Sequence, residues 1–234
     1  MDLIEVSENQ NRHPWELSRT ACVLSELKKL GIHGNVLDIG CGDSYFDRRL
    51  LRENPALSVY GVDINLKTEL HDGKLHALNS LEHLPSMKFD FILMMDVLEH
   101  IEDDFSYLDK IRREYLNGGG YIFITVPAFQ SLYSLHDKEL KHFRRYNHAE
   151  LKSLVEKCGL KEISWSYFYF SLIFARLLTK NKTENLSGWQ KSAESLATKL
   201  FVRVLNADFA FCRLLSKIAL HLPGLSLLAV CKAQ

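Results

Sequence analysis

The chain has 234 residues, of which 47% are hydrophobic, so it can form one large α/β domain or two small ones around a buried core. The chain has 29 lysines and arginines and 29 aspartates and glutamates, so it has no overall basic charge that would attract nucleic acid. A local basic patch is still possible with this balanced composition. The five cysteines include no Cys-x-x-Cys pair, which argues against a disulfide framework or a thiolate zinc site and favours reduced thiols in the cytoplasm.

Residues 1–33 predict an N-terminal helical cap. They hold no basic segment followed by an apolar run, so we expect no signal peptide. Apolar residues recur at helical spacing from 17 to 30, and Gly31 follows as a stop. No part of the chain reaches the ~18 uninterrupted apolar residues of a spanning helix. We therefore expect a cytoplasmic protein that at most lies on a membrane surface.

Residues 34–170 predict alternating strands and helices, with strand-like runs such as "NVLDI", "SVYGVDI", "KLHAL", "FDFILMM" and "YIFITV". The longest runs are apolar on both faces, which is typical of strands covered by helices on both sides. Helices are indicated over "DDFSYLDKIRREYLNGGG", with acidic residues first and glycines last, and from about Asn147 to Gly159. The sequence therefore predicts an α/β fold with a doubly wound, mostly parallel, seven-stranded sheet.

Residues 171–223 predict a helical insertion, because the strand-like run "LSLLAV" follows within residues 224–234. We expect the whole chain, 1–234, to be a single domain with residues 34–170 as its ligand-binding core. The insertion begins in the aromatic stretch "SWSYFYF" and continues as amphipathic helices with interspersed basic residues. Three interpretations stay open, namely a layer that covers an acceptor pocket, a contact with a membrane surface, and a dimer interface.

The stretch "VLDIGCGDSYF" predicts a strand, a glycine turn and a helix. A dinucleotide fingerprint would need a third glycine where Tyr45 stands after Gly40 and Gly42. Asp38 next to the turn favours a ligand with positive charge. Asp63 follows the second strand, where a carboxylate can accept both hydroxyls of a ribose. The residues thus indicate a nucleoside with a cationic tail.

At these residues the chain resembles the class I S-adenosylmethionine-dependent methyltransferases, over about residues 36–126. The resemblance implies a Rossmann-like methyltransferase fold and S-adenosyl-L-methionine as cofactor. It implies that the cofactor contacts Asp38, Gly40, Gly42, Asp63, Ile64, Ser80, Leu81 and Met95. Ser80 stands where the family often has an aspartate. Ser44 stands where many members have glycine, and we expect its backbone to be helical and its hydroxyl to cap the first turn.

Methyl transfer from a sulfonium mainly requires an aligned nucleophile and the exclusion of water, with a general base if the acceptor is a hydroxyl. His142 is the first candidate for that base and His100 the second. Asp96, Glu99 and His100 would share one face of a helical turn. They look like the metal-binding Glu-x-x-Glu-His of some quinone-pathway O-methyltransferases, but they fall short of a complete hard-ligand shell, so we expect no metal.

Arg144, Arg145 and Tyr146 follow the fifth strand, where a doubly wound enzyme places its acceptor site. Two arginines suit a phosphate or a carboxylate on the acceptor, and a surface loop with helix-capping contacts is the alternative. The segment "HFRRY" resembles a broad subgroup of bacterial methyltransferases of unassigned substrate, and "HPWELSR" resembles its opening. Trp15 is accordingly expected to close over the pocket or to pack in the core.

The sequence thus predicts methyl transfer from S-adenosylmethionine to a small-molecule or lipid-linked acceptor, at oxygen rather than carbon or nitrogen. An RNA or tRNA methyltransferase and a non-catalytic cofactor-binding module are the alternatives. We expect no nucleic-acid partner and leave peripheral membrane contact and oligomeric state open.

Overall fold

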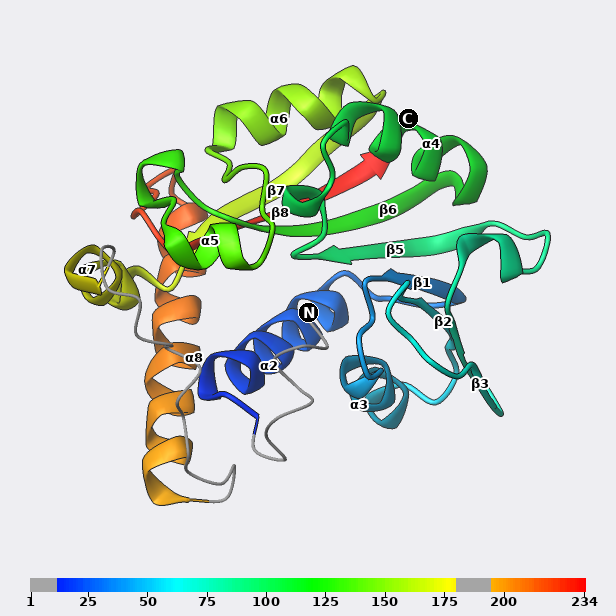
Figure 1. Cartoon of the computed structure of the whole chain (residues 1–234), viewed down its shortest axis with the longest axis horizontal. Coiled ribbons are helices and arrows are strands. Elements are labelled where there is room, and N and C mark those ends of the chain that lie inside the picture. The colour runs from blue at the N-terminus through cyan, green and yellow to red at the C-terminus, as the bar shows by residue number, and fades with distance from the viewer. Residues whose placement is uncertain (1–11, 180–194) are drawn as a thin grey trace.

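The computed structural model describes residues 12–179 and 195–234, and its centre is an eight-stranded sheet in the order β3-β4-β2-β1-β5-β6-β8-β7 (Figure 1). Strands β1, β2, β4, β5 and β6 pair in parallel, whereas β3 and β8 run antiparallel to their neighbours. The predicted α/β, mostly parallel sheet is confirmed. It has one strand more than expected, because the short β3 folds back on β4 as a hairpin. The strands are β1 (Asn35–Ile39), β2 (Ser58–Val62), β3 (Leu70–Asp72), β4 (Leu75–Leu78), β5 (Phe89–Met95), β6 (Leu116–Pro127), β7 (Leu160–Phe168) and β8 (Ser226–Ala233).

Helices cover both faces of the sheet and bury two separate apolar layers. One layer joins the sheet to α4 and α6, through residues such as Leu108 and Leu151. The other joins it to α2, α3 and α8, through Leu27, Leu50 and Leu205. The helices are α2 (Pro14–Lys29), α3 (Tyr45–Glu53), α4 (Asp104–Tyr115), α5 (Leu135–Glu139), α6 (His148–Lys157), α7 (Phe170–Thr179) and α8 (Leu196–Ser216).

Strand β5 shows why its sequence is apolar throughout. Alternate side chains point to opposite faces of a strand, so Ile92 and Met94 enter the first layer while Phe91 and Leu93 enter the second. All four are at most 1% exposed. A strand buried on both faces has no polar side, which is the pattern expected of a doubly wound sheet.

Local signals account for most helix ends. Gly31 and Gly159 follow α2 and α6 with positive φ angles of 67° and 70°, a region that glycine enters without strain. Asn147 caps α6, and its side chain accepts a hydrogen bond from the Glu150 amide. Helix α4 ends at Tyr115, so the glycines that we expected to end it lie instead within β6.

The insertion between β7 and β8 contains α7 and α8, as expected, although residues 180–194 lie outside the described part, as do residues 1–11 of the N-terminal cap. Helix α8 packs beside α2 (Figure 1). Ser18 donates to Asn206 at 2.7 Å, and Arg213 pairs with Glu26 at 2.6 Å. None of the described helices combines the length and the apolar character needed to cross a bilayer.

Gly224, just before β8, tests how closely the end of the insertion packs against β7. A Cβ atom there would lie 2.6 Å from both the backbone nitrogen and the carbonyl carbon of Phe168. Gly224→Ala is therefore expected to lower the free energy of unfolding by roughly 1–3 kcal/mol through overpacking. The control is Gly118→Ala, where a Cβ meets nothing within 4 Å. Equal urea midpoints for the two variants would contradict this account of the insertion.

Candidate active site

The turn after β1 is built on backbone conformations that favour glycine. Gly40 and Gly42 have positive φ angles of 78° and 58°. The Gly40 amide donates to the Val62 carbonyl at 2.7 Å, which ties the turn to the end of β2. A Cβ on Gly40 would lie 2.8 Å from the Val97 side chain. The backbone conformation thus favours glycine at both positions, whatever the ligand requires.

Ser44 differs from the expectation. Its φ of 58° and ψ of 25° are left-handed rather than helical, and its side chain makes no capping hydrogen bond to α3. Its hydroxyl instead contacts the Cys41 sulfur at 3.9 Å. The glycine that many family members carry here fits this geometry, because a serine pays a conformational cost in the left-handed region.

Asp63 lies at the end of β2, next to the glycine turn, as predicted. Its Oδ2 accepts the Gly42 amide at 3.0 Å, and its Oδ1 accepts the Asn65 amide at 2.8 Å. The residue is only 6% exposed. A carboxylate has about four lone-pair directions, so Asp63 keeps acceptor capacity for ligand hydroxyls while it holds the turn.

Two fully buried acids lie below the turn. Asp38 in β1 and Asp47 in α3 have fully buried carboxyl groups that lie close to each other. Burial, and then the neighbouring Asp47, raise the pKa of Asp38 well above its usual range. A cationic ligand beside Asp38 would favour its ionised form and so lower that pKa.

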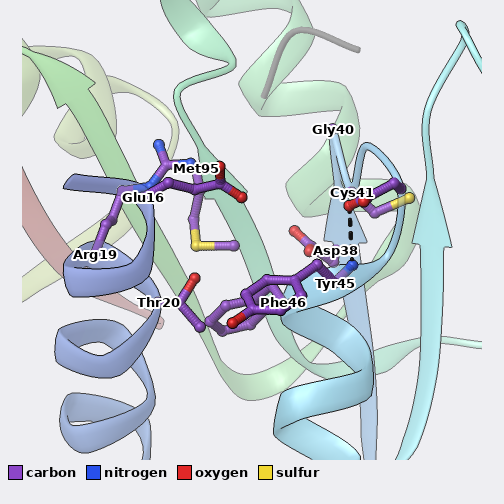
Figure 2. A pocket seen from close by; sticks show the side chains of 10 residues that line it. Glu16, Arg19, Thr20, Asp38, Gly40, Cys41, Tyr45, Phe46 and Met95 are labelled. Atoms are coloured by element: carbon purple, nitrogen blue, oxygen red, sulfur yellow. Dashed lines mark hydrogen bonds between the residues drawn. The ribbon is translucent and has the colours of Figure 1, made fainter. Parts of the chain in front are cut away.

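A hollow opens beside this turn, as Figure 2 shows. Its lining comes from α2, the end of β1 and the turn that follows it, the start of α3 and the end of β5. Asp38, Gly40 and Met95 line it, whereas Asp63 does not. The lining residues are Glu16, Arg19, Thr20, Asp38, Gly40, Cys41, Asp43, Tyr45, Phe46 and Met95.

Helix α2 closes one side of this hollow through ion pairs. Arg12 pairs with both Glu16 and Asp43, and its guanidinium lies 3.8 Å from the centre of the Tyr45 ring. Arg19 is 7% exposed and pairs with Asp96 at the end of β5. The sequence predicted a helical cap here but not the ion pairs with Asp43 and Asp96, because these partners lie far apart in the chain.

The other expected cofactor residues lie around the same sheet edge. Ile64 follows Asp63 and is 85% exposed, which is unusual for a large apolar side chain. Ser80 caps the short 3₁₀ turn Leu81–His83, and its hydroxyl accepts the Glu82 amide at 3.2 Å. Leu81 packs half-buried against the first apolar layer. Their contact with a cofactor stays a prediction.

His142 is held by a buried carboxylate that the sequence analysis missed. Its Nδ1 lies 3.1 Å from Oδ1 of Asp137, a residue of α5 that is fully buried. Burial alone would raise the pKa of Asp137, but the hydrogen bond with His142 and the Arg145 guanidinium hold it well below the usual range. An ionised Asp137 can only accept, so Nδ1 of His142 carries the proton and Nε2 is left as the basic nitrogen.

The two predicted catalytic histidines lie together. The rings of His100 and His142 pack edge to face with centroids 4.6 Å apart. The backbone amide of Phe143, next to His142, donates to the Glu99 carbonyl at 2.7 Å, which fixes the two segments to each other. Residues about 40 positions apart are thus brought to one place.

Asp96, Glu99 and His100 do not share one face of a helical turn. Asp96 has a φ of 56° and lies outside the 3₁₀ turn Leu98–His100, and its carboxylate accepts Thr125 and pairs with Arg19. Within the described residues the donor atoms of Glu99, His100 and His142 all lie within 4.8 Å of one another. One carboxylate and two imidazoles form a donor set that zinc accepts.

The predicted acceptor residues lie along a second, open crevice between α4 and α6. Arg144, Arg145 and Tyr146 all line it, together with residues such as Asp104 and Lys157. Arg144 pairs with Asp104 at 3.0 Å. Arg145 and Tyr146 are buried, Arg145 donating to Asp137 and the Tyr146 hydroxyl lying 2.8 Å from Asp104. This crevice and the first hollow share no lining residue.

Trp15 lies at neither hollow. It is half-buried at the start of α2, with the Arg19 guanidinium 4.8 Å from the centre of its ring. Its carbonyl accepts the hydroxyl of Tyr169 at 3.2 Å. Arg176 of α7 is a further residue that the sequence did not single out, and it donates to Asp137 at 3.1 Å and to Ser134 at 2.6 Å.

A mostly parallel doubly wound sheet, a two-glycine turn after its first strand and an acid after its second define the class I S-adenosylmethionine-dependent methyltransferases. A sequence profile described as a methyltransferase domain matches residues 15–164. The chain belongs to that family. The class expected from the sequence is confirmed, and S-adenosylmethionine is the cofactor of the class.

Individual relatives differ in what they act on. The tRNA U34 carboxymethyltransferase of Hahella chejuensis is 33% identical over 170 residues, which cover 65% of this chain and 51% of that protein. The mitochondrial ubiquinone biosynthesis O-methyltransferase of Candida albicans is 30% identical over 105 residues, which cover 38% and 31%. The chain thus spans about a third to a half of the length of these relatives.

Among solved structures, the N-methyltransferase NodS of Bradyrhizobium japonicum, in complex with S-adenosyl-L-homocysteine, has a TM-score of 0.54 and 15% identity. The match covers 97% of this chain and 93% of that one. At this identity the likeness shows the fold and not the acceptor.

Asp63→Ala tests the cofactor side. The variant is expected to bind S-adenosylmethionine more weakly by roughly 1–3 kcal/mol, because ribose hydrogen bonds and the support of the Gly42 amide are lost together. Titration calorimetry measures this. Asp72→Ala, an exposed acid on β3, is the matched control. Unchanged affinity in Asp63→Ala would mean that the ribose lies elsewhere.

Glu99→Gln tests whether the buried Glu99 makes the stability of the protein depend on pH. Burial raises the pKa of Glu99 from 4.5 to about 8, so the folded state keeps a proton that the unfolded chain releases. Stability is therefore lost as pH rises from 4.5 to about 8. Glutamine does not titrate, so its free energy of unfolding should not show this loss. The difference in free energy of unfolding between the variant and the parent should therefore rise by on the order of 3 kcal/mol from pH 4.5 to pH 8. Urea unfolding at both pH values measures it, and a pH-independent difference would contradict it.

Proposed function

We propose that the chain transfers the methyl group of S-adenosylmethionine to a hydroxyl oxygen of a small-molecule or lipid-linked acceptor. The observation that carries this proposal is the Asp137–His142 pair, with Nδ1 and Oδ1 3.1 Å apart and His100 against the imidazole. A hydroxyl is a poor nucleophile until a base takes its proton, and a histidine oriented by a carboxylate performs that task.

The cofactor is assigned to the edge where β1 and β2 end. Asp63 would accept the ribose hydroxyls, and the backbone of Gly40 and Gly42 allows a ligand to come close to the turn. When bound, S-adenosylmethionine supplies a methyl group attached to a cationic sulfur. The acceptor oxygen would attack the methyl carbon, and the sulfur would leave as a neutral thioether. Asp38 supports that positive charge. Ile64, Ser80, Leu81 and Met95 complete the proposed contacts, and the exposed Ile64 is suited to cover an apolar ring.

His142 and Asp137 would then handle the proton. Nε2 of His142 takes it from the acceptor hydroxyl as the new carbon–oxygen bond forms. The imidazolium produced is stabilised by the negative charge of Asp137, which also keeps the ring in one orientation. His100 packs edge-on to the His142 ring and restricts its rotation, and it is the second candidate for the base.

A metal at Glu99, His100 and His142 would compete with this role. The ion would need Nε2 of His142, because Nδ1 already faces Asp137. Displacement at a sulfonium carbon needs no Lewis acid, since the leaving group is a neutral thioether. We therefore assign His142, with His100 as the second candidate, to proton transfer and assign no metal.

The acceptor itself is assigned to the side of Arg144, Arg145 and Tyr146. The open crevice there carries the exposed Lys157 and the half-buried Arg144, which is paired with Asp104, and a phosphate on the acceptor would bind Lys157 and compete with Asp104 for Arg144. Arg145 and Tyr146 would act mainly by holding the crevice walls, because their polar atoms face Asp137 and Asp104. Trp15 is proposed to pack against Arg19 at the cofactor side rather than to touch the acceptor.

A tRNA acceptor is the second candidate, because several relatives near 30% identity are named tRNA U34 carboxymethyltransferases. The balanced charge of the chain weighs against it. Incubation with methyl-labelled cofactor and a cell extract separates the cases. Label in the organic or small-molecule phase supports the proposal, ribonuclease-sensitive label overturns it in favour of RNA, and the absence of label would indicate a non-catalytic module.

The catalytic pair has its own test. His142→Gln is expected to lower turnover by roughly 10²–10⁴-fold while cofactor affinity changes little, because glutamine cannot take the proton but its amide can still donate to Asp137. Asp137→Asn should also lower turnover and should alter the pH–rate profile. His136→Gln, in the same segment but outside the pair, is the matched control. Full turnover in His142→Gln would move the base to His100.

A further inference from the structure

Helix α8 carries an apolar stripe that the fold leaves exposed. Its side chains recur every three or four residues and therefore lie on one face of the helix. Leu196 and Leu200 at its start are 86% and 64% exposed, and the stripe continues past the helix end with Ile218 at 72%. The members of this stripe, here called the α8 stripe, are Leu196, Leu200, Val204, Ala207, Phe211, Leu214 and Ile218.

The α8 stripe is not the face that holds the helix to the protein. That face is formed by Leu205, Phe209 and Cys212, which are at most 4% exposed and lie about half a turn away. Arg213 and Asn206 add polar contacts to α2 on the side toward the protein. In Figure 1, α8 stands at one side of the molecule, beside α2, and its first turns reach beyond that helix.

The stripe is bordered by positive charge. Lys199, Arg203 and Lys217 are exposed, and each lies one position from a stripe residue on the same flank. Asp208 is the only acidic residue between 195 and 224. Its carboxylate accepts the backbone amides of Phe170 and Ser171 at 3.0 and 2.7 Å, so it serves to cap α7. The exposed side of α8 is therefore apolar and cationic.

We propose that the α8 stripe docks on a membrane surface that contains anionic lipids. An interfacial helix combines one apolar face with flanking lysine and arginine and lies in the plane of the bilayer, which is what α8 offers. A second copy of the chain would match the apolar stripe but would bring these cations against one another with no acidic side chain from α8 to pair them. A bilayer with anionic headgroups satisfies both parts of the surface.

This surface does not depend on the proposed methyl transfer. It uses no residue of the Asp137–His142 pair or of either hollow. It would, however, hold the protein where a lipid-linked acceptor resides, so the two proposals agree.

Flotation with vesicles tests the docking. The full chain is mixed with vesicles of phosphatidylcholine alone and of phosphatidylcholine with phosphatidylglycerol. We expect binding to the mixed vesicles, weakened by added salt, and little binding to phosphatidylcholine alone. Leu200→Ser combined with Phe211→Ser should reduce binding by about tenfold or more, because two inserted side chains are lost. Lys199→Gln combined with Arg203→Gln should reduce binding selectively to the anionic vesicles.

Ile163→Ser, at an apolar residue of β7 that is 46% exposed, is the control and should bind as the parent does. All variants are checked for the parental melting temperature and cofactor affinity, and light scattering records their oligomeric state. Absence of binding by the parent chain overturns the proposal, as does undiminished binding by the Leu200–Phe211 variant. A parent dimer that this variant converts to a monomer, without vesicle binding, assigns the stripe to self-association and also overturns it.

Discussion

The Asp137 carboxylate is fully buried, and it accepts hydrogen bonds from Ser134, His142, Arg145 and Arg176. A buried negative charge is costly unless it is paired and fully hydrogen-bonded, so these donors cannot be removed singly without a large penalty. These donors come from three segments, which are the turns between β6 and α5, the residues just before α6, and α7 in the insertion. One carboxylate thus fixes the orientation of His142 and the place of α7 together.

That constraint also explains how the two sides of the site are connected. Met95 lines the hollow beside the glycine turn, Asp104 lines the crevice between α4 and α6, and the chain from 95 to 104 carries Glu99 and His100. His142 reaches the same segment because the Phe143 amide is bound to the Glu99 carbonyl. Under the proposed function, the two histidines on this segment would stand between a cofactor in the hollow and an acceptor in the crevice, as transfer between two ligands requires.

The sequence predicted what depends on local signals. Gly31, Asn147 and Gly159 mark helix ends through capping and positive φ, and Gly40, Gly42 and Asp63 carry a spacing tied to one fold. It did not reveal the Asp137 cluster, since Arg176 lies 39 positions away and nothing in a single sequence pairs them. Nor did it reveal that Asp96 turns toward Arg19, or that Ser44 is left-handed, because both follow from tertiary contacts. Asp137 can be read from the sequence, but the residues that donate hydrogen bonds to it cannot.

In the arrangement that we propose, the cofactor's sulfur faces the paired histidines while its ribose lies on Asp63. A crystal structure of the chain with S-adenosyl-L-homocysteine tests this most directly. We expect ribose hydroxyls within hydrogen-bond distance of the Asp63 carboxylate, and the sulfur open toward His100 and His142. A complex in which the Arg19–Asp96 pair screens the sulfur from both histidines would contradict it.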